Sequence, residues 1–322
     1  IDAIDRDDAY EVLVLELSSF QLHWAKQAQF QAAAILNIAD DHLDWHGSFE
    51  AYADAKLSIL DRAEIAILNA DDGAVVTRAN RFSGRKVFFS IDTPAPGEIG
   101  VVEELLVDRA FVADPQQASM ICELNDIVPT VPHNVSNALA AAGLARAINV
   151  SHEDIQKALQ AFRPGRHRIE VIHEADGIAW VDDSKATNPH ATAASLMSHL
   201  SVVWIAGGLA KGADMDSLIE RYAPRIKVAI LVGEDRGLIE AALIKHAPTI
   251  PRILIDAPSD YTRGGESNSL MESVVSAAAK HAQSGDAVLL APACASMDQF
   301  ISYADRGDRF SAAVRKVIAH EA

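Results

Sequence analysis

Short apolar runs separated by polar, helix-forming stretches recur along most of the chain. In the first half they fall at Val12–Leu15, Ala33–Asn37 and Ile65–Asn69, and the first belongs to a predicted strand at Glu11–Glu16. Each run is followed by polar residues and then by a segment with helical spacing. Such alternation is typical of parallel strands covered by helices on both faces. The pattern therefore predicts an α/β domain with a mostly parallel sheet.

The pattern changes between Phe82 and Pro132, where prolines and glycines interrupt short segments. This indicates irregular β structure with turns. Two helices are predicted next, at Asn134–Ile148 and Glu153–Phe162. The stretch Arg163–Arg168, RPGRHR, then combines Pro and Gly with charged side chains, as linkers between domains do. We therefore predict two domains, residues 1–163 and 164–322.

The second half repeats strand and helix with little interruption. The predicted strands are Gly177–Val181, Val202–Ala206, Val228–Val232, Arg252–Ile255 and Ala287–Leu290. Helices are predicted to begin near Asn188, Ser217, Gly237, Ser267 and Asp308. This is the pattern of a doubly wound domain, which binds ligands at the carboxyl ends of its strands.

Length, charge and cysteine content narrow the class of protein. A chain of 322 residues, 49% of them apolar, favours two domains with a core each. The net charge of −17 argues against a nucleic-acid partner, which would need a basic face. Two distant cysteines fit a reducing cytoplasm, and no apolar run approaches the ~20 residues of a membrane span. We expect a soluble, cytoplasmic monomer that does not insert into membranes.

The richest stretch is Val181–His190, VDDSKATNPH, where an apolar strand runs into a polar turn and an Ala-rich helix. Two carboxylates, two hydroxyls, an ammonium and an amide fall between Asp182 and Asn188. The N-terminus of a helix offers unpaired N–H groups and a positive dipole end to a phosphate or carboxylate. The same residue types also cap helices. The stretch is therefore either an anion site or a heavily decorated helix cap.

Candidate residues also stand elsewhere. In the first half, Glu16 ends a predicted strand beside serines, which suits Mg²⁺, a cation that prefers oxygen ligands. His42 lies in NIADDHLDWH, and Lys56 lies on a predicted helix at Ser48–Arg62, where a lysine usually extends past apolar neighbours to solvent. Taken singly, each of these three has a structural interpretation as well.

In the second half, Gly207 and Gly208 follow a strand and precede Lys211, so this loop could bring backbone and an ammonium to an anion. Pro292–Phe300, PACASMDQF, follows the last strand, and Ser296 in it could donate to a ligand carboxylate. Cys294 is interpreted as a small buried residue rather than a nucleophile.

Taken in chain order, these motifs resemble the Mur ligase family. The matching blocks are ELSSFQL at Glu16–Leu22, DDH at Asp40–His42, Lys56, HNVSNALAA at His133–Ala141, RPGRHR, DDSKATN, GG…K and PACASMDQF. The resemblance implies a truncated central ATPase domain followed by a Rossmann-like C-terminal domain. It also implies an ATP-dependent acid–amino-acid ligase of peptidoglycan synthesis. The motif DSKATN favours the members that add D-glutamate to UDP-N-acetylmuramoyl-L-alanine through an acyl phosphate.

The resemblance implies roles for the candidate residues. Glu16, His42 and Lys56 would act at two Mg²⁺ ions, with Lys56 carbamylated so that the ammonium becomes an anion. The residues expected to bind ATP are Asn134 and Asn137 at the base or ribose, Arg168 at the terminal phosphate, Asp183 at the ribose and Lys185 near the phosphates. The residues expected around D-glutamate are Thr187, Lys211, Ser296, Met297 and Tyr303.

The chain departs from the family pattern in three ways. The family has a Gly-rich phosphate loop before its ELSSFQ block, and Gly207–Lys211 does not provide one. A domain that holds the UDP group is not in the sequence, and Tyr303 stands where Phe is common. The chain begins at Ile1 without Met, so we expect it to be part of a longer protein and to lack ligase activity alone. The alternatives are another Mur ligase, a folylpolyglutamate synthetase-like ligase or a non-catalytic binding scaffold.

Overall fold

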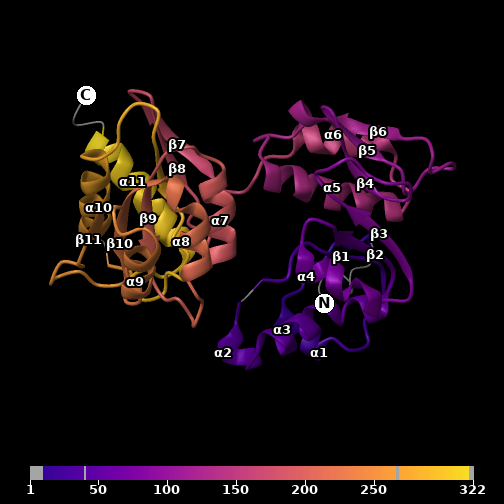
Figure 1. The fold of residues 1–322 in the computed structure, drawn as a ribbon, viewed down its shortest axis with the longest axis horizontal. Helices are drawn as coiled ribbons and strands as arrows, with labels where there is room; N and C mark the ends of the chain where they lie inside the picture. The colour runs from indigo at the N-terminus through magenta and orange to yellow at the C-terminus, as the bar shows by residue number, and fades with distance from the viewer. Residues whose placement is uncertain (1–9, 40, 266–267, 319–322) are drawn as a thin grey trace. The chain divides into compact units, whose positions relative to one another are not determined.

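The computed structural model describes residues 10–39, 41–265 and 268–318 (Figure 1). The chain divides into two compact units, each with its own six-stranded sheet. Unit 1 comprises Ile1–Ile38, Ser48–Cys122 and Ser136–Ile155, and unit 2 comprises Ala39–Gly47, Glu123–Val135 and Gln156–Ala322. Among the described residues, no helix is long and apolar enough to cross a membrane.

The first sheet follows chain order from β1 to β6. Its strands are β1 (Phe30–Ile35), β2 (Ala63–Asn69), β3 (Arg85–Phe89), β4 (Ile99–Val102), β5 (Leu105–Asp108) and β6 (Ser119–Glu123). The first four strands are parallel, and β5 runs antiparallel to β4. The segments predicted as irregular β structure therefore complete the same sheet.

Helices cover both faces of this sheet. The helices of the first half are α1 (Ser19–Trp24), α2 (Leu43–His46), α3 (Phe49–Leu57), α4 (Gly73–Arg78), α5 (Pro132–Ala147) and α6 (His152–Ala161), with short 3₁₀ turns at Leu60–Arg62, Ala79–Arg81 and Leu124–Asp126. Tyr52 of α3 and Val75 of α4 pack with Leu68 of β2. On the opposite side of β2, a Cβ on Gly143 would lie 2.8 Å from Ile67, so this glycine lets α5 approach the sheet closely.

The second sheet has the strand order β11-β10-β9-β12-β8-β7. Its strands are β7 (Glu170–Ala175), β8 (Ile178–Asp182), β9 (Val202–Gly207), β10 (Ile226–Val232), β11 (Arg252–Leu254) and β12 (Ala287–Leu290). All neighbouring pairs are parallel except β7 with β8. This is the doubly wound arrangement that the apolar runs predicted, with one antiparallel edge strand added.

Alternate side chains of the second sheet enter two separate cores. Its helices are α7 (Pro189–Met197), α8 (Asp216–Tyr222), α9 (Arg236–His246), α10 (Ser269–Ala279) and α11 (Tyr303–Ile318), with a 3₁₀ turn at Ala223–Arg225. Trp204 of β9 packs into the core under α7, α8 and α9, whereas its neighbours Val203 and Ile205 pack under α10 and α11. Burial on both faces explains why these strands read as continuous apolar runs.

Three predictions about secondary structure were wrong or incomplete. Glu11–Glu16 is not a strand: it pairs with no strand among the described residues, and Val14 is 86% exposed. The last helix begins at Tyr303 rather than near Asp308, because Ser302 caps it by accepting from the Asp305 N–H. Strand β7 was missed. The predicted helix start at Ser267 and the first residue of the DDH block, Asp40, lie outside the described residues.

Candidate nucleotide and amino-acid site

Three loops meet at the carboxyl ends of strands in unit 2. They follow β8, β9 and β12 and contain most of the predicted second-half site residues. Backbone lies close to backbone here, since a Cβ on Gly207 at the end of β9 would lie 1.8 Å from the oxygen of Val232, the last residue of β10. A Cβ on Gly208 would likewise lie 2.1 Å from the Ala295 oxygen, and both glycines have positive φ. The GG pair therefore has a packing requirement that no other residue type meets.

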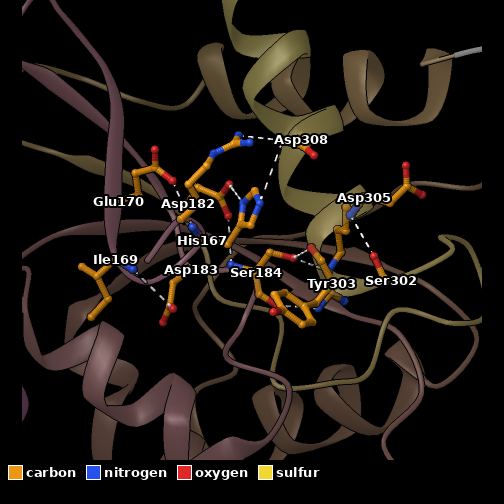
Figure 2. Close-up of polar contacts among 12 residues, drawn as sticks. His167, Ile169, Glu170, Asp182, Asp183, Ser184, Ser302, Tyr303, Asp305 and Asp308 are labelled. Atoms are coloured by element: carbon orange, nitrogen blue, oxygen red, sulfur yellow. Dashed lines mark hydrogen bonds and ion pairs between the residues drawn. The ribbon is translucent and has the colours of Figure 1, made fainter. Parts of the chain in front are cut away.

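Asp182, the last residue of β8, forms a buried pair with His167. The His167 Nδ1 lies 2.7 Å from Asp182 Oδ2, and the Ser184 N–H donates to Asp182 Oδ1 at 2.9 Å (Figure 2). Gly307 of α11 leaves room for the pair, since a Cβ there would lie 2.2 Å from His167 Nδ1. Burial raises the pKa of Asp182, and the His167 and Ser184 hydrogen bonds oppose that rise.

The possible ligand atoms of His167, Glu170 and Asp182 lie within 4.8 Å of one another. Hydrogen bonds account for this closeness, because the Glu170 carboxylate accepts the His167 backbone N–H at 2.9 Å and Asp182 accepts at the imidazole. These three residues therefore form a hydrogen-bonded network that connects the segment before β7 with β7 and β8.

Asp183 points away from the His167–Asp182 pair (Figure 2). It is 6% exposed, its Oδ2 accepts from the Ser195 hydroxyl, and its Oδ1 accepts from the Ile169 N–H at 3.4 Å. Burial raises the pKa of Asp183 to about 6, although the Ser195 and Ile169 hydrogen bonds lower it. A buried carboxylate that follows a strand end, with one oxygen held only by a 3.4 Å contact, is suited to accept from a ligand hydroxyl.

The Lys185 ammonium lies over the Tyr303 ring, 4.1 Å from its centroid. The Lys185 backbone N–H donates to the His167 oxygen at 3.2 Å, and Thr187 N–H donates to the Lys185 oxygen at 2.8 Å. Lys185, Thr187 and Tyr303 are all half-buried. The ring therefore holds a cation at the mouth of the loop, where an anionic ligand could reach it.

The guanidinium of Arg306 in α11 contacts backbone oxygens of all three loops. Its guanidinium is 2% exposed and donates to Ser184 Oγ and Ser184 O, each at 2.9 Å, and to Cys294 O at 3.2 Å. A weaker contact at 3.5 Å reaches Gly207 O. Burial lowers the pKa of Arg306 to about 10 and raises that of the Cys294 thiol to about 12. The thiol thus stays protonated at neutral pH and is no nucleophile.

The remaining residues predicted around D-glutamate lie on two of these loops. Leu209 and Ala295 form an antiparallel bridge, which brings the Lys211 loop beside the loop that carries Ser296. Ser296 is buried, whereas Met297 and Lys211 are exposed. Lys211 has a φ of 52°, an uncommon backbone conformation for a lysine.

The predicted first-half residues are divided between the two units. Glu16 is exposed on the unpaired segment, and Lys56 of α3 donates from Nζ to the Asn37 oxygen at 2.8 Å in unit 1. His42 is grouped with unit 2, and its Nε2 lies 3.7 Å from Asp41.

The residues predicted to bind the nucleotide from the helix at Asn134–Ile148 and the linker at Arg163–Arg168 differ in exposure. Asn134 is buried, and its amide donates to the Pro129 oxygen at 2.9 Å. Asn137 and Arg168 are exposed. Arg168 is close enough to Asp183 for its charge to lower the pKa of that carboxylate.

Sequence reasoning missed three residues that shape the site, namely His167, Ser195 and Arg306. The motif RPGRHR contains His167, and a histidine beside a strand-ending DD pair was an available signal. Ser195 lies within an Ala-rich helix and contacts a carboxylate outside it, and Arg306 donates to both the hydroxyl and the backbone oxygen of Ser184, 122 residues earlier in the chain. No local pattern marks such partners.

Comparison with known proteins identifies the family. Residues 3–145 match the Mur ligase middle domain, and residues 167–294 match the Mur ligase glutamate ligase domain. The UDP-N-acetylmuramoylalanine–D-glutamate ligase of Streptomyces coelicolor is 49% identical over 98% of this chain and 67% of its own length. That of Thermobifida fusca is 50% identical over 97% of this chain and 66% of its own length. The chain thus spans about two thirds of the length of these relatives.

Solved structures show the same fold at low identity. A pseudomurein peptide ligase type C from Methanothermus fervidus matches with a TM-score of 0.62, at 18% identity, over 95% of this chain and 66% of its own. The MurF ligase of Thermotoga maritima in complex with ADP matches with a TM-score of 0.60, at 17% identity, over 95% of this chain and 66% of its own. Together, the domain matches and the high-identity relatives show that the chain belongs to the Mur ligase family, among the UDP-N-acetylmuramoylalanine–D-glutamate ligases.

Proposed function

We propose that this chain supplies the nucleotide and D-glutamate groups of an ATP-dependent ligase that joins D-glutamate to UDP-N-acetylmuramoyl-L-alanine in peptidoglycan synthesis. The observation that carries the proposal is the meeting of three loops at one edge of the second sheet. One loop holds Asp183 and Lys185, another Lys211 and the third Ser296. Ligands of doubly wound sheets bind at this edge.

The proposed reaction needs a phosphorylated carboxyl group. A carboxylate is a poor electrophile, and transfer of the terminal phosphoryl of ATP to it creates a leaving group that the amine of D-glutamate displaces as phosphate. In this scheme Asp183 accepts from a ribose hydroxyl, and Lys185 offsets phosphate charge. Asn134, Asn137 and Arg168 complete the proposed nucleotide contacts.

The proposed amino-acid site uses charge and hydrogen bonding. Lys211 pairs with a carboxylate of D-glutamate, and Ser296 donates to one. Thr187, Met297 and Tyr303 form the surrounding wall. The Tyr303 hydroxyl adds a polar group where an apolar ring would offer none, while the ring face already holds the Lys185 ammonium.

The first-half residues do not fit Mg²⁺ as they stand. The Lys56 ammonium, held by the Asn37 oxygen, cannot ligate a cation, so the three positions offer one carboxylate and one imidazole. Conversion of Lys56 to a carbamate would supply the missing oxygens, and its remaining N–H could still donate to Asn37. We propose Mg²⁺ sites at Glu16, His42 and Lys56 only when Lys56 is carbamylated.

Setting and assembly are also proposals. We propose that the protein works in the cytoplasm, because the proposed substrates are UDP-linked and water-soluble. The acidic net charge of −17 argues against nucleic-acid partners. We propose that it works as a monomer, with the domain boundary within residues 163–168.

Calorimetric titration of the chain with ATP and with D-glutamate tests the proposed sites. Asp183→Asn should weaken ATP binding about tenfold and leave D-glutamate binding unchanged, because an ionised acceptor is lost. Lys211→Ala should weaken D-glutamate binding by a similar factor and spare ATP. The exposed residues Asp260 and Lys280 provide matched controls, as Asp260→Asn and Lys280→Ala.

The opposite pattern, with Lys211→Ala weakening ATP alone, would refute the assignment. A coupled assay for ADP release with UDP-N-acetylmuramoyl-L-alanine and D-glutamate distinguishes a ligase from a non-catalytic binding scaffold. Binding of both ligands without any amide product would favour the non-catalytic scaffold.

A further inference from the structure

Ser195 lies in the interior of α7, two residues before the helix ends, and is completely buried. Its hydroxyl donates to Asp183 Oδ2, twelve positions earlier in the chain. Serine hydroxyls inside helices commonly return to the carbonyl four residues back. Here that alternative acceptor, Ala191 O, is 3.4 Å away, and the nearer acceptor is the carboxylate. The side chain therefore serves a partner outside its own helix.

The Asp183 carboxylate is held from two sides. Ser195 contacts Oδ2 from α7, and the Ile169 N–H contacts Oδ1 from the residue before β7. The charged groups that face it are Asp182 on β8 and Arg168 beside Ile169. The backbone contact is long, at 3.4 Å, so the hydroxyl is the stronger of the two fixed donors.

We propose that Ser195 is a positioning residue of the nucleotide site, whose hydroxyl holds the Asp183 carboxylate ionised and aimed for a ribose hydroxyl. The proposal rests on the proposed function, because it takes Asp183 as a contact of ATP. It adds a residue on the helix that follows the DDSKATN loop. Alanine at this position would fill the same helical space without the donor, so the hydroxyl itself is the feature that matters.

The Ser195 hydroxyl also affects the protonation of the Asp183 carboxylate. Burial raises the pKa of Asp183 to about 6, and the Ser195 hydrogen bond holds it below the value that burial alone would give. Without Ser195, we expect a larger protonated fraction at pH 6 to 7. A protonated carboxyl group would then compete with a ribose hydroxyl as a donor instead of accepting from it.

The decisive measurement is an NMR titration of the Asp183 carboxyl carbon in the free chain. In Ser195→Ala the pKa of Asp183 should rise above the wild-type value, whereas in Ser198→Ala it should stay unchanged. Ser198 is a matched control, since it caps the same helix and its hydroxyl donates to Ala194 O at 3.1 Å. An unaltered Asp183 titration in Ser195→Ala, with the helix intact by circular dichroism, would overturn the proposal.

ATP titrations at two pH values connect the hydroxyl to binding. If the hydrogen bond changes the ionisation equilibrium about tenfold, Ser195→Ala should bind ATP roughly threefold more weakly at pH 6.5 and nearly normally at pH 8.5. Equal ATP affinity of wild type and Ser195→Ala at pH 6.5 would overturn the ligand role of Ser195, provided Asp183→Asn weakens binding. If Asp183→Asn binds ATP as wild type does, the proposed nucleotide site fails instead, and the NMR titration still decides the Ser195 contact.

Discussion

Two adjacent carboxylates at the end of β8 have different partners because neighbouring residues of a strand face opposite sides. Asp182 turns towards His167 and α11, and Asp183 turns towards Ser195 and α7. Only Asp183 is left with a backbone contact as long as 3.4 Å on one oxygen. At the scale of single residues, the Asp182 carboxylate is held inside the fold, and the Asp183 carboxylate is the one that we propose as a ligand contact.

Asp183 should lower the stability of the free chain at neutral pH. Its folded pKa of about 6 lies above the unfolded value of about 3.9, so the folded state holds the proton more tightly. Its contribution to the unfolding free energy therefore falls as the pH rises from about 4, the unfolded pKa, to about 6, the folded pKa. Asp183→Asn should unfold with a free energy about 3 kcal/mol higher than wild type at pH 8, and with nearly the wild-type value at pH 4. Urea unfolding at both pH values measures this, and equal effects at both would contradict it.

Lys56 should react with carbon dioxide when its amine is unprotonated. The half-buried position between the Tyr52 ring and the Asn37 oxygen suits a carbamate, whose N–H can keep the same hydrogen bond. With ¹³C-labelled bicarbonate, we expect one carbamate signal that Lys56→Ala abolishes and Lys157→Ala, an exposed control, retains. A signal that survives in Lys56→Ala would assign the modification to another amine.

At the scale of elements, α11 anchors the three loops of the proposed site. Its Arg306 binds oxygens on two loops and contacts the third, and its Gly307 makes room for the His167–Asp182 pair. The sequence predicted this helix five residues too late. Apolar residues at helical spacing mark its later turns, where Phe310, Ala313 and Val314 are buried, whereas the residues buried in its first two turns are Arg306 and Gly307, which give no apolar pattern.

Replacing Arg306 should loosen the loops as well as the fold. Arg306→Met keeps much of the volume but leaves the oxygens of Ser184 and Cys294 without their donor. We expect a loss of about 3 kcal/mol in unfolding free energy. Hydrogen exchange should also quicken at the loops after β8 and β12. Arg315→Met, on the exposed side of the same helix, is the control, and equal losses in both would contradict an anchoring role.

The elements were predictable to the extent that local pattern decides them. Strands such as β9 and β12 are buried on both faces, so their sequences are continuous apolar runs, and these runs predicted the strands. Glu11–Glu16 has the same kind of composition but no neighbouring strand among the described residues, and a strand requires one. The Asp183 and Lys211 loops were visible as motifs. The Ser195 and Arg306 contacts depend on tertiary packing, which spacing in the sequence does not reveal.

At the scale of the whole molecule, the two sheets should unfold as separate units, since each has its own buried core. Calorimetry should show two transitions. Leu139→Ala and Leu289→Ala remove the same fully buried side chain from unit 1 and unit 2 respectively, at about 3 kcal/mol each. Each variant should lower one transition and spare the other. A common shift of a single transition in both would contradict this division.

The unpaired segment at Val12–Leu15 also affects how concentrated solutions of the chain behave. Four consecutive exposed apolar residues, which pair with no strand among the described residues, resemble the short segments that assemble into intermolecular sheets. Glu11 and Glu16 stand at either end, where like charges on neighbouring copies repel. The double variant Glu11→Gln, Glu16→Gln should therefore scatter more light on storage than wild type does. These two glutamates would then act as gatekeepers that keep separate molecules apart.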